Sequence, residues 1–237
     1  MRFYRSMSPI KAMTFDLDDT LYDNRPIIRR VEQQITNWLH QHHPVSATRS
    51  LGWWQQLKKE VVIAEPLLKH DVTQWRFEQV FQGLFQLGYD KQKAQQAAQA
   101  TIEEVLILRS QFEVPEESHR VLRILSQRYP LVAITNGNVD VNKIGLSQYF
   151  SLVLKAGPDG LAKPEADLFI QAAEFLNLQP KEILHVGDHL VTDVLGAKQN
   201  GFQACWFNDQ EADLIHHKHS KTLPDVEINR LDSLLQF

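Results

Sequence analysis

The 237-residue chain has little of two features that mark common classes of protein. Cysteine occurs once, as Cys205, which excludes an internal disulfide and suits a reducing compartment. Positive charge is not in excess, because the formal net charge is -4, and this argues against nucleic acid as a main partner. We therefore expect a cytoplasmic protein that holds any anionic ligand at a local site.

Long hydrophobic runs are also lacking. No segment approaches the roughly 18 apolar residues of a membrane span, and residues 1–11 lack the apolar stretch of a secretory signal. The chain has 43% hydrophobic and 23% charged residues, which is typical of a globular protein with a packed core. We expect no targeting signal, no membrane association and no obligate protein partner.

Residues 24–114 differ in pattern from the rest of the chain. Here apolar residues recur at spacings of three and four, as on one face of an amphipathic helix, in four successive segments. The flanking ranges, 1–23 and 115–237, alternate short apolar runs with helical patterns, which is typical of a parallel sheet with crossover helices. The sequence predicts an α/β core with an open, Rossmann-like parallel sheet, into which a helical-bundle cap domain is inserted.

Short apolar runs predict the strands of this sheet. The runs cover residues 12–15, 131–134, 152–154, 183–186 and 203–206, with a further edge strand at 225–228. Reactive side chains follow four of these strands, at the carboxyl end of the strand or in the next loop. They are Asp16 and Asp18, Thr135 and Asn136, Lys163, and Asp188 and Asp193. In an open parallel sheet the ligand crevice lies outside the carboxyl ends, so we expect these side chains to meet in one pocket.

The grouping of four carboxylates requires a cation. Unit charges about 4 Å apart repel by roughly 4 kcal/mol at an effective dielectric constant of 20. Oxygen ligands favour a hard divalent ion, and Mg²⁺ is the best fit to a few carboxylates, water and a substrate phosphate. Lys163, Thr135 and Asn136 would bind the phosphoryl oxygens. Asp16 is the predicted nucleophile, and Asp18 is the predicted general acid and later base.

The segment Asp16-Leu17-Asp18-Asp19-Thr20 after an apolar strand resembles the signature of phosphatases of the haloacid dehalogenase superfamily. Three further motifs resemble that family in the same order over nearly the whole chain: Thr135-Asn136-Gly137, Lys163-Pro164, and Gly187-Asp188 with Asp193. The helical insertion resembles the type-one cap of the family.

This resemblance implies a role for each matching residue. Asp16, Asp18 and Asp188 would bind Mg²⁺, Asp18 through its backbone carbonyl, and Thr20 and Asp193 would support them. Asp16 and Asp18 would carry out the chemistry through an aspartyl-phosphate intermediate. Thr135 and Lys163 match phosphate-binding positions of the family.

Three longer stretches narrow the resemblance. The run from Asp18 to Asn24, the segment 70–77 and the stretch from Ile183 to Asp193 resemble phosphatases that act on flavin mononucleotide or on 5-amino-6-(5-phospho-D-ribitylamino)uracil, a riboflavin precursor. On this basis Asn24 and Trp75 are candidate substrate contacts. Most aromatic residues of the cap are expected to be bundle core, because they recur at helical spacing.

Other functions remain open at this stage. A sugar phosphatase or a phosphomutase of the same superfamily would keep every motif, and a non-catalytic binding protein could be built on the same fold. A 2-haloacid dehalogenase would not need Asp18. The sequence also leaves open the role of His189, which stands where many relatives have serine or an acidic residue. The cluster His216, His217 and His219 is explained better by a solvated loop than by a transition-metal site, because no second ligand motif accompanies it.

Overall fold

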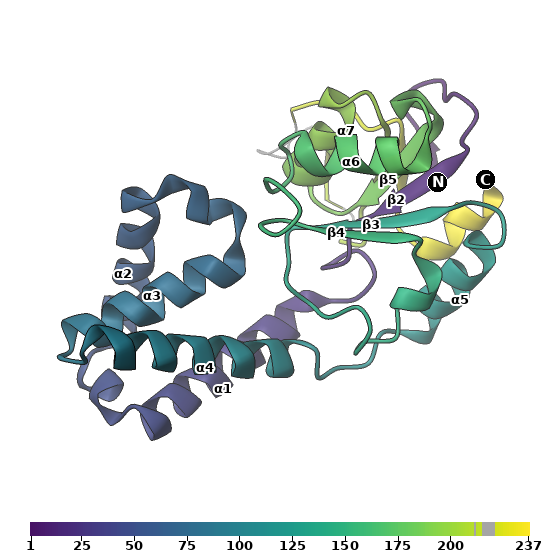
Figure 1. Ribbon diagram of the computed structural model, residues 1–237. Coiled ribbons are helices and arrows are strands. Elements are labelled where there is room, and N and C mark those ends of the chain that lie inside the picture. Colours follow the sequence, from purple (N-terminus) through teal and green to yellow (C-terminus); the bar gives the residue numbers. More distant parts are fainter. Residues whose placement is uncertain (211, 215–220) are drawn as a thin grey trace. The chain divides into compact units, whose positions relative to one another are not determined.

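The computed structural model describes residues 1–210, 212–214 and 221–237, so the His216, His217 and His219 cluster lies outside the described residues. The chain forms two compact units. The α/β unit comprises Met1–Asn24, Glu113–Gly137 and Val141–Phe237, and the helical unit comprises Arg25–Phe112 with Asn138–Asp140 (Figure 1). The short segment Asn138–Asp140 belongs to the helical unit although it follows strand β3 of the α/β unit in the chain. There the Asn138 side-chain amide donates a hydrogen bond to the Thr73 hydroxyl (3.1 Å).

The α/β unit contains a seven-stranded sheet in the order β1-β7-β6-β5-β2-β3-β4. Its strands are β1 (Arg2–Phe3), β2 (Ala12–Phe15), β3 (Leu131–Thr135), β4 (Leu152–Lys155), β5 (Ile183–Gly187), β6 (Gln203–Phe207) and β7 (Val226–Ile228). All neighbouring pairs are parallel except β1 and β7, and this confirms the predicted α/β class. The prediction of β7 as an edge strand is wrong, because β1 pairs outside it. A two-residue strand is too short to leave a hydrophobic pattern in the sequence.

Strands β2, β3 and β5 are buried along their whole length. Helices α6 (Asp167–Leu176) and α7 (Gly196–Gln199) lie on one side of the sheet and α5 (Glu116–Leu125) on the other (Figure 1). Such two-sided cover explains why these strands are continuous apolar runs rather than alternating patterns. Because β2, β3, β4, β5 and β6 run parallel, their carboxyl ends share one edge of the sheet, where the motif residues lie.

The helical unit contains α1 (Asn24–His42), α2 (Leu51–Ala64), α3 (Val72–Gln86) and α4 (Lys91–Arg109), with short 3₁₀ turns at Pro44–Thr48 and Pro66–His70. Side chains cap three of these helices: Ser50 accepts from the Trp53 amide, Asp71 from the amides of Thr73 and Gln74, and Asp90 from the Lys93 amide. The apolar stripes of the helices meet in a core of their own, which contains Leu57, Val80, Leu84, Ala97 and Ala98. Among the described helices of the chain, none has the length and apolar character needed to cross a bilayer.

Candidate active site

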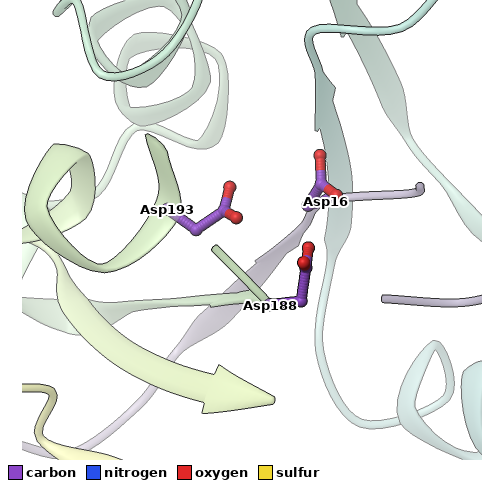
Figure 2. A group of neighbouring side chains, drawn as sticks. All are labelled: Asp16, Asp188 and Asp193. Atoms are coloured by element: carbon purple, nitrogen blue, oxygen red, sulfur yellow. The ribbon is translucent and has the colours of Figure 1, made fainter. Parts of the chain in front are cut away.

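Three carboxylates meet at the carboxyl edge of the sheet (Figure 2). Asp16 follows β2, whereas Asp188 and Asp193 follow β5. The pairing of Phe15 with Val186 sets these two strand ends side by side. One oxygen from each carboxylate lies within 4.8 Å of the others. The structure therefore brings Asp16 together with Asp188 and Asp193, which lie more than 170 positions further along the chain, and these are three of the four carboxylates that the sequence predicts to meet.

The environment of Asp16 and Asp188 disfavours the ionised form of both side chains. Burial raises the pKa of Asp16 well above its ordinary value; Lys163 opposes this, while the charges of Asp193, Asp188 and Asp18 add to it. Burial, followed by the charges of Asp193 and Asp19, raises the pKa of Asp188 to about 7. A divalent cation would relieve this repulsion, and carboxylate oxygens are the ligands that a hard cation prefers. The residues present thus fit a metal of the Mg²⁺ type.

Lys163 supplies the positive charge of the site. Its Nζ donates hydrogen bonds to Asp16 Oδ1 (2.7 Å) and to Asp193 Oδ1 (2.6 Å), and its side chain is 1% exposed. Burial lowers the pKa of Lys163, but the two carboxylates outweigh it and hold the pKa above its ordinary value. The ammonium group is therefore charged and fixed between Asp16 and Asp193. An ammonium has three N–H donors, of which these bonds use two.

Asn136 and Thr135 organise the loop around Lys163. The Asn136 side chain donates to the Lys163 carbonyl (3.0 Å) and accepts from the Lys163 amide (2.8 Å). The buried Thr135 hydroxyl accepts from the Gly137 amide (2.9 Å). Both residues lie at the predicted strand end. Asn136 also has a role that the sequence did not indicate, because its side-chain amide fixes the backbone of Lys163 through two hydrogen bonds.

Thr20 connects the first and the last motif. Its hydroxyl lies 3.2 Å from Asp188 Oδ1 and 3.4 Å from Asp16 Oδ2, and it accepts a hydrogen bond from the Asp188 amide (3.1 Å). The Trp206 indole donates to the Asp188 carbonyl (2.7 Å) from the neighbouring strand β6. These bonds hold the Asp188 backbone from both sides.

Asp18 stands apart from the three clustered carboxylates. Tyr22 donates a hydrogen bond from its hydroxyl to Asp18 Oδ1 (2.7 Å). Asp18 Oδ2 packs against Gly137 so closely that a Cβ added to this glycine would lie 2.4 Å from the oxygen. Asp19, at φ +59°, turns the chain so that Tyr22 faces Asp18. The sequence alone gives no sign of Tyr22, because its contact with Asp18 depends on this turn.

Asp193 is held through both of its oxygens. Oδ1 accepts from Lys163 and from His185 Nε2 (3.2 Å), and Oδ2 accepts from the His189 amide (2.9 Å). Burial raises the pKa of Asp193, but the charge of Lys163 and the bond from His185 outweigh burial and keep the pKa well below its ordinary value. Asp193 is therefore a fixed anion. His185 was not a candidate from the sequence.

The remaining candidates have other neighbours. The Asn24 amide donates to Asp19 Oδ1 (2.8 Å), and the buried side-chain oxygen of Asn24 has no hydrogen-bond partner among the described residues. Trp75 packs against the core of the helical unit, donates from Nε1 to the Lys58 carbonyl (2.7 Å), and has Lys58 Nζ 4.9 Å from its ring centre. His189 accepts from the amides of Val191 and Thr192, so its ring caps the turn that carries Asp193.

Comparisons with known proteins agree with this geometry. The family of haloacid dehalogenase-like hydrolases matches residues 10–201. The 5-amino-6-(5-phospho-D-ribitylamino)uracil phosphatase YigB of Escherichia coli (strain K12) is 45% identical over 99% of this chain and 98% of its own length. A glyceraldehyde 3-phosphate phosphatase of Pyrococcus furiosus is 28% identical over 97% of the chain and 93% of its own length. The crystal structure of a 2-haloacid dehalogenase from Pseudomonas syringae pv. tomato DC3000 superposes with a TM-score of 0.90 at 34% identity, covering 96% of this chain and 97% of that one.

Proposed function

The chain belongs to the haloacid dehalogenase-like hydrolases, and on that premise we propose that it is a phosphatase that hydrolyses small phosphomonoesters through an aspartyl phosphate on Asp16. The observation that carries this proposal is the Lys163 ammonium, which joins the Asp16 carboxylate to the fixed anion Asp193, with Asp18 held separately by Tyr22. Asp16 and Asp18 of the first motif therefore have different partners, as a nucleophile and an acid/base require.

In the first step an oxygen of Asp16 forms a bond to phosphorus while the bond between phosphorus and the ester oxygen breaks. Asp18 gives its proton to the departing alkoxide, and Lys163 holds Asp16 and a phosphoryl oxygen in place. In the second step Asp18 takes a proton from water, whose oxygen bonds to phosphorus as the Asp16–phosphorus linkage breaks. Inorganic phosphate leaves, and both carboxyl groups return to their starting states. Thr135 and Asn136 would bind the remaining phosphoryl oxygens.

We assign Mg²⁺ to the acidic cluster. Asp16 and Asp188 would hold it through their carboxylates, and the family resemblance adds the backbone carbonyl of Asp18; Asp193 would support the site through Lys163. When bound, Mg²⁺ supplies charge neutralisation for the carboxylates and the phosphoryl group. The raised pKa values of Asp16 and Asp188 support this assignment, because burial and then the neighbouring carboxylates disfavour the ionised form of both groups, and a bound cation would favour it.

For the substrate we propose 5-amino-6-(5-phospho-D-ribitylamino)uracil, flavin mononucleotide, or both. The 45% identity to YigB over nearly the whole length of both chains supports a step in riboflavin biosynthesis. The helical unit contains a cavity of about 590 Å³ whose lining includes Trp54, Lys58 and the ion pair of Arg76 with Glu32, so this unit offers space and charged groups to a small molecule. A sugar phosphatase or phosphomutase is the alternative within the family, and substrate preference distinguishes them.

A haloacid dehalogenase is favoured by the structural superposition but not by the site. That reaction uses an aspartate nucleophile at carbon and releases a halide, which needs no proton. Such a reaction would use neither Asp18, which Tyr22 holds, nor the hydrogen-bonded pair Asp188 and Thr20. A phosphoryl reaction uses all of these groups.

The test is a panel of reactions on one preparation of the full chain. Phosphate release is measured from the ribitylamino-uracil phosphate, flavin mononucleotide, several sugar phosphates and p-nitrophenyl phosphate, with Mg²⁺ and with a chelator, and halide release is measured from 2-chloropropionate. We expect Mg²⁺-dependent phosphate release, fastest from the two riboflavin-pathway esters, and no halide release. Halide release without phosphate release would overturn the proposal, and a preference for sugar phosphates would overturn only the substrate assignment.

A further inference from the structure

We propose that His185, which belongs to none of the four motifs, is a positioning residue for Lys163. Through a hydrogen bond from Nε2 it fixes the Asp193 carboxylate, and Asp193 in turn fixes the ammonium group beside the nucleophile. The kinetic part of this inference rests on the proposed phosphatase function; the structural part does not.

The observation is an unbroken line of polar contacts through the sheet. Thr14 Oγ1 lies 2.8 Å from His185 Nδ1, and His185 Nε2 lies 3.2 Å from Asp193 Oδ1. Asp193 Oδ1 accepts from Lys163 Nζ at 2.6 Å, and the same Nζ donates to Asp16 Oδ1 at 2.7 Å. The side chains of His185, Asp193 and Lys163 are 0%, 2% and 1% exposed, so water does not replace these bonds.

Strand register places the imidazole in this line. Thr14 on β2 and His185 on β5 are direct partners in the parallel sheet, so their side chains point to the same face. The ring of Phe169 packs edge to face against the imidazole, with ring centres 5.1 Å apart. Thr14 and Phe169 therefore limit the rotation of the ring.

The partners of His185 also determine which nitrogen carries the proton. A carboxylate only accepts hydrogen bonds, so Nε2 must be the donor to Asp193. Nδ1 is then the acceptor, and the Thr14 hydroxyl is its donor. An apolar residue would fill this buried position without the cost of desolvating an imidazole, so the polar ring is explained by the bond that it makes.

The consequence for Lys163 follows from the bonds of Asp193. Oδ1 is shared by Lys163 and His185, while Oδ2 accepts from the His189 amide and from the Thr192 hydroxyl (3.4 Å). Without His185 only Lys163 holds Oδ1, and Oδ1 can shift while Oδ2 keeps its own bonds. The ammonium group would shift with Oδ1 and leave the position in which it meets Asp16 and a phosphoryl oxygen.

The first experiment compares His185→Phe, which keeps a planar ring but removes the donor, with His185→Gln, which keeps a donor. Loss of a group that orients an active-site residue typically costs about 10- to 100-fold in activity. We expect His185→Phe to lower kcat/KM at least about tenfold, equally for an alkyl phosphate and for p-nitrophenyl phosphate, because leaving-group protonation by Asp18 is unaffected. We expect the kcat/KM of His185→Gln to stay within about threefold of the wild-type value, because glutamine keeps a donor that orients Asp193.

Phe202→Leu is the matched stability control. Phe202 packs on the same Phe169 ring (5.3 Å) but has no polar contact with Asp193, so this variant should lose stability and keep kcat/KM at temperatures well below unfolding. Equal losses of activity in the Phe and Gln variants, or the same loss in Phe202→Leu, would overturn the inference. If His185→Phe does not fold, Thr14→Val provides the test, since the two side chains have nearly the same shape. Thr14→Val should leave the His185 ring less firmly oriented and lower kcat/KM by a few-fold. Unchanged activity in this variant would contradict the inference.

A second measurement does not depend on activity. Nitrogen chemical shifts of the His185 ring in labelled wild-type protein should show a protonated Nε2 and an unprotonated Nδ1. Thr14→Val should change the Nδ1 shift, because it removes the hydroxyl donor, while Nε2 stays protonated. A proton on Nδ1 alone would overturn the inference. If the wild type released phosphate from no ester, the proposed function would fail while the ring shifts still decided the structural part.

Discussion

At the scale of single residues, Asp16 has the most demanding environment in the site. It lies 2.7 Å from Lys163, and burial, together with the neighbouring carboxylates, raises its pKa. We expect Asp16→Asn to lower phosphate release by at least about a thousandfold, because an amide is a far poorer nucleophile and metal ligand. The fold should persist, since the change keeps size and removes repulsion between neighbouring carboxylates.

Phosphate release and circular dichroism, measured together, check this prediction. Asp90→Asn serves as the control, because Asp90 caps α4 in the helical unit and asparagine caps equally well. Substantial turnover by Asp16→Asn would argue against the covalent mechanism.

The rate loss caused by removing Asp18 should grow with the basicity of the leaving group. Asp18→Asn is expected to slow hydrolysis of an alkyl phosphate much more than that of p-nitrophenyl phosphate, whose leaving oxygen needs little protonation. Tyr22→Phe, which removes only the bond to Asp18 Oδ1, should show the same selectivity at a smaller size, roughly three- to tenfold on the alkyl ester, the worth of about one hydrogen bond.

The two esters are compared by steady-state and single-turnover kinetics, which separates the first step from hydrolysis of the intermediate. Equal losses on both esters in the first step would remove the support for leaving-group protonation by Asp18.

The sequence could predict which motif residues meet, because carboxyl ends of parallel strands share one edge and each motif follows a strand. It could not predict the partners of those residues. Thr14 and His185 meet through the register of β2 against β5, and Tyr22 reaches Asp18 through a turn at Asp19. Register and turn geometry depend on the folded chain as a whole and leave no pattern in a single sequence.

At the scale of elements, the end of β5 leaves no room for a side chain at Gly187. A Cβ there would lie 2.3 Å from Cγ of Asp193. We expect Gly187→Ala to displace Asp193 and Lys163 together, lowering kcat/KM by about 10- to 100-fold and stability by about 1–3 kcal/mol.

Gly52→Ala in α2 is the matched control. The nearest atom to its added Cβ is Ser50 Oγ at 3.8 Å, so the helix should gain about 0.5–1 kcal/mol without a change in activity. Kinetics and urea unfolding of both variants test the contrast. Wild-type activity in Gly187→Ala would mean that the position of Asp193 does not limit the reaction.

Helix α3 carries Trp75, the aromatic candidate for substrate recognition. We expect Trp75→Ala to weaken turnover of flavin mononucleotide while sparing p-nitrophenyl phosphate, provided that the variant folds. The bonds of Trp75 within the helical unit give the competing expectation, since loss of packing and of the hydrogen bond to Lys58 would lower stability and both activities together. The ratio of the two activities at a temperature below unfolding separates the two outcomes.

At the scale of the whole molecule, the site is a product of complete folding of the α/β unit. Lys163 and Asp16 are 147 positions apart, and that unit is assembled from three separate stretches of chain. The fold class and the positions of most strands could be predicted from apolar runs, whereas β1 could not, because two residues carry no periodicity. Charge repulsion in the finished site should therefore be visible in the stability of the whole protein.

The pH dependence of stability tests this link. The pKa of Asp188 is raised to about 7 in the folded protein, above the value of about 3.9 for an unfolded aspartate, so the folded state binds the proton more tightly. The resulting stabilisation is fully present below the unfolded value and is lost as the pH rises through the folded value. For metal-free protein we expect the free energy of unfolding to fall by roughly 2 kcal/mol between pH 5 and pH 8, less than an isolated buried group would give because the site is partly open to water. Asp16 contributes with the same sign, whereas Asp193, whose pKa is lowered, stays ionised throughout.

Urea unfolding at several pH values, with and without Mg²⁺, measures this dependence in the wild type and in Asp188→Asn. The variant should be more stable than the metal-free wild type at pH 8 and should lose part of the pH dependence, because it carries no charge at this position while the raised pKa of Asp16 still contributes. Mg²⁺ should stabilise the wild type at pH 8, where Asp188 is ionised, and should stabilise the variant much less. Asp90→Asn, on a helix far from any acidic cluster in its own unit, should behave as the wild type does. An unchanged pH dependence in Asp188→Asn would show that the repulsion lies elsewhere, and equal stabilisation of both proteins by Mg²⁺ would remove Asp188 from the metal site.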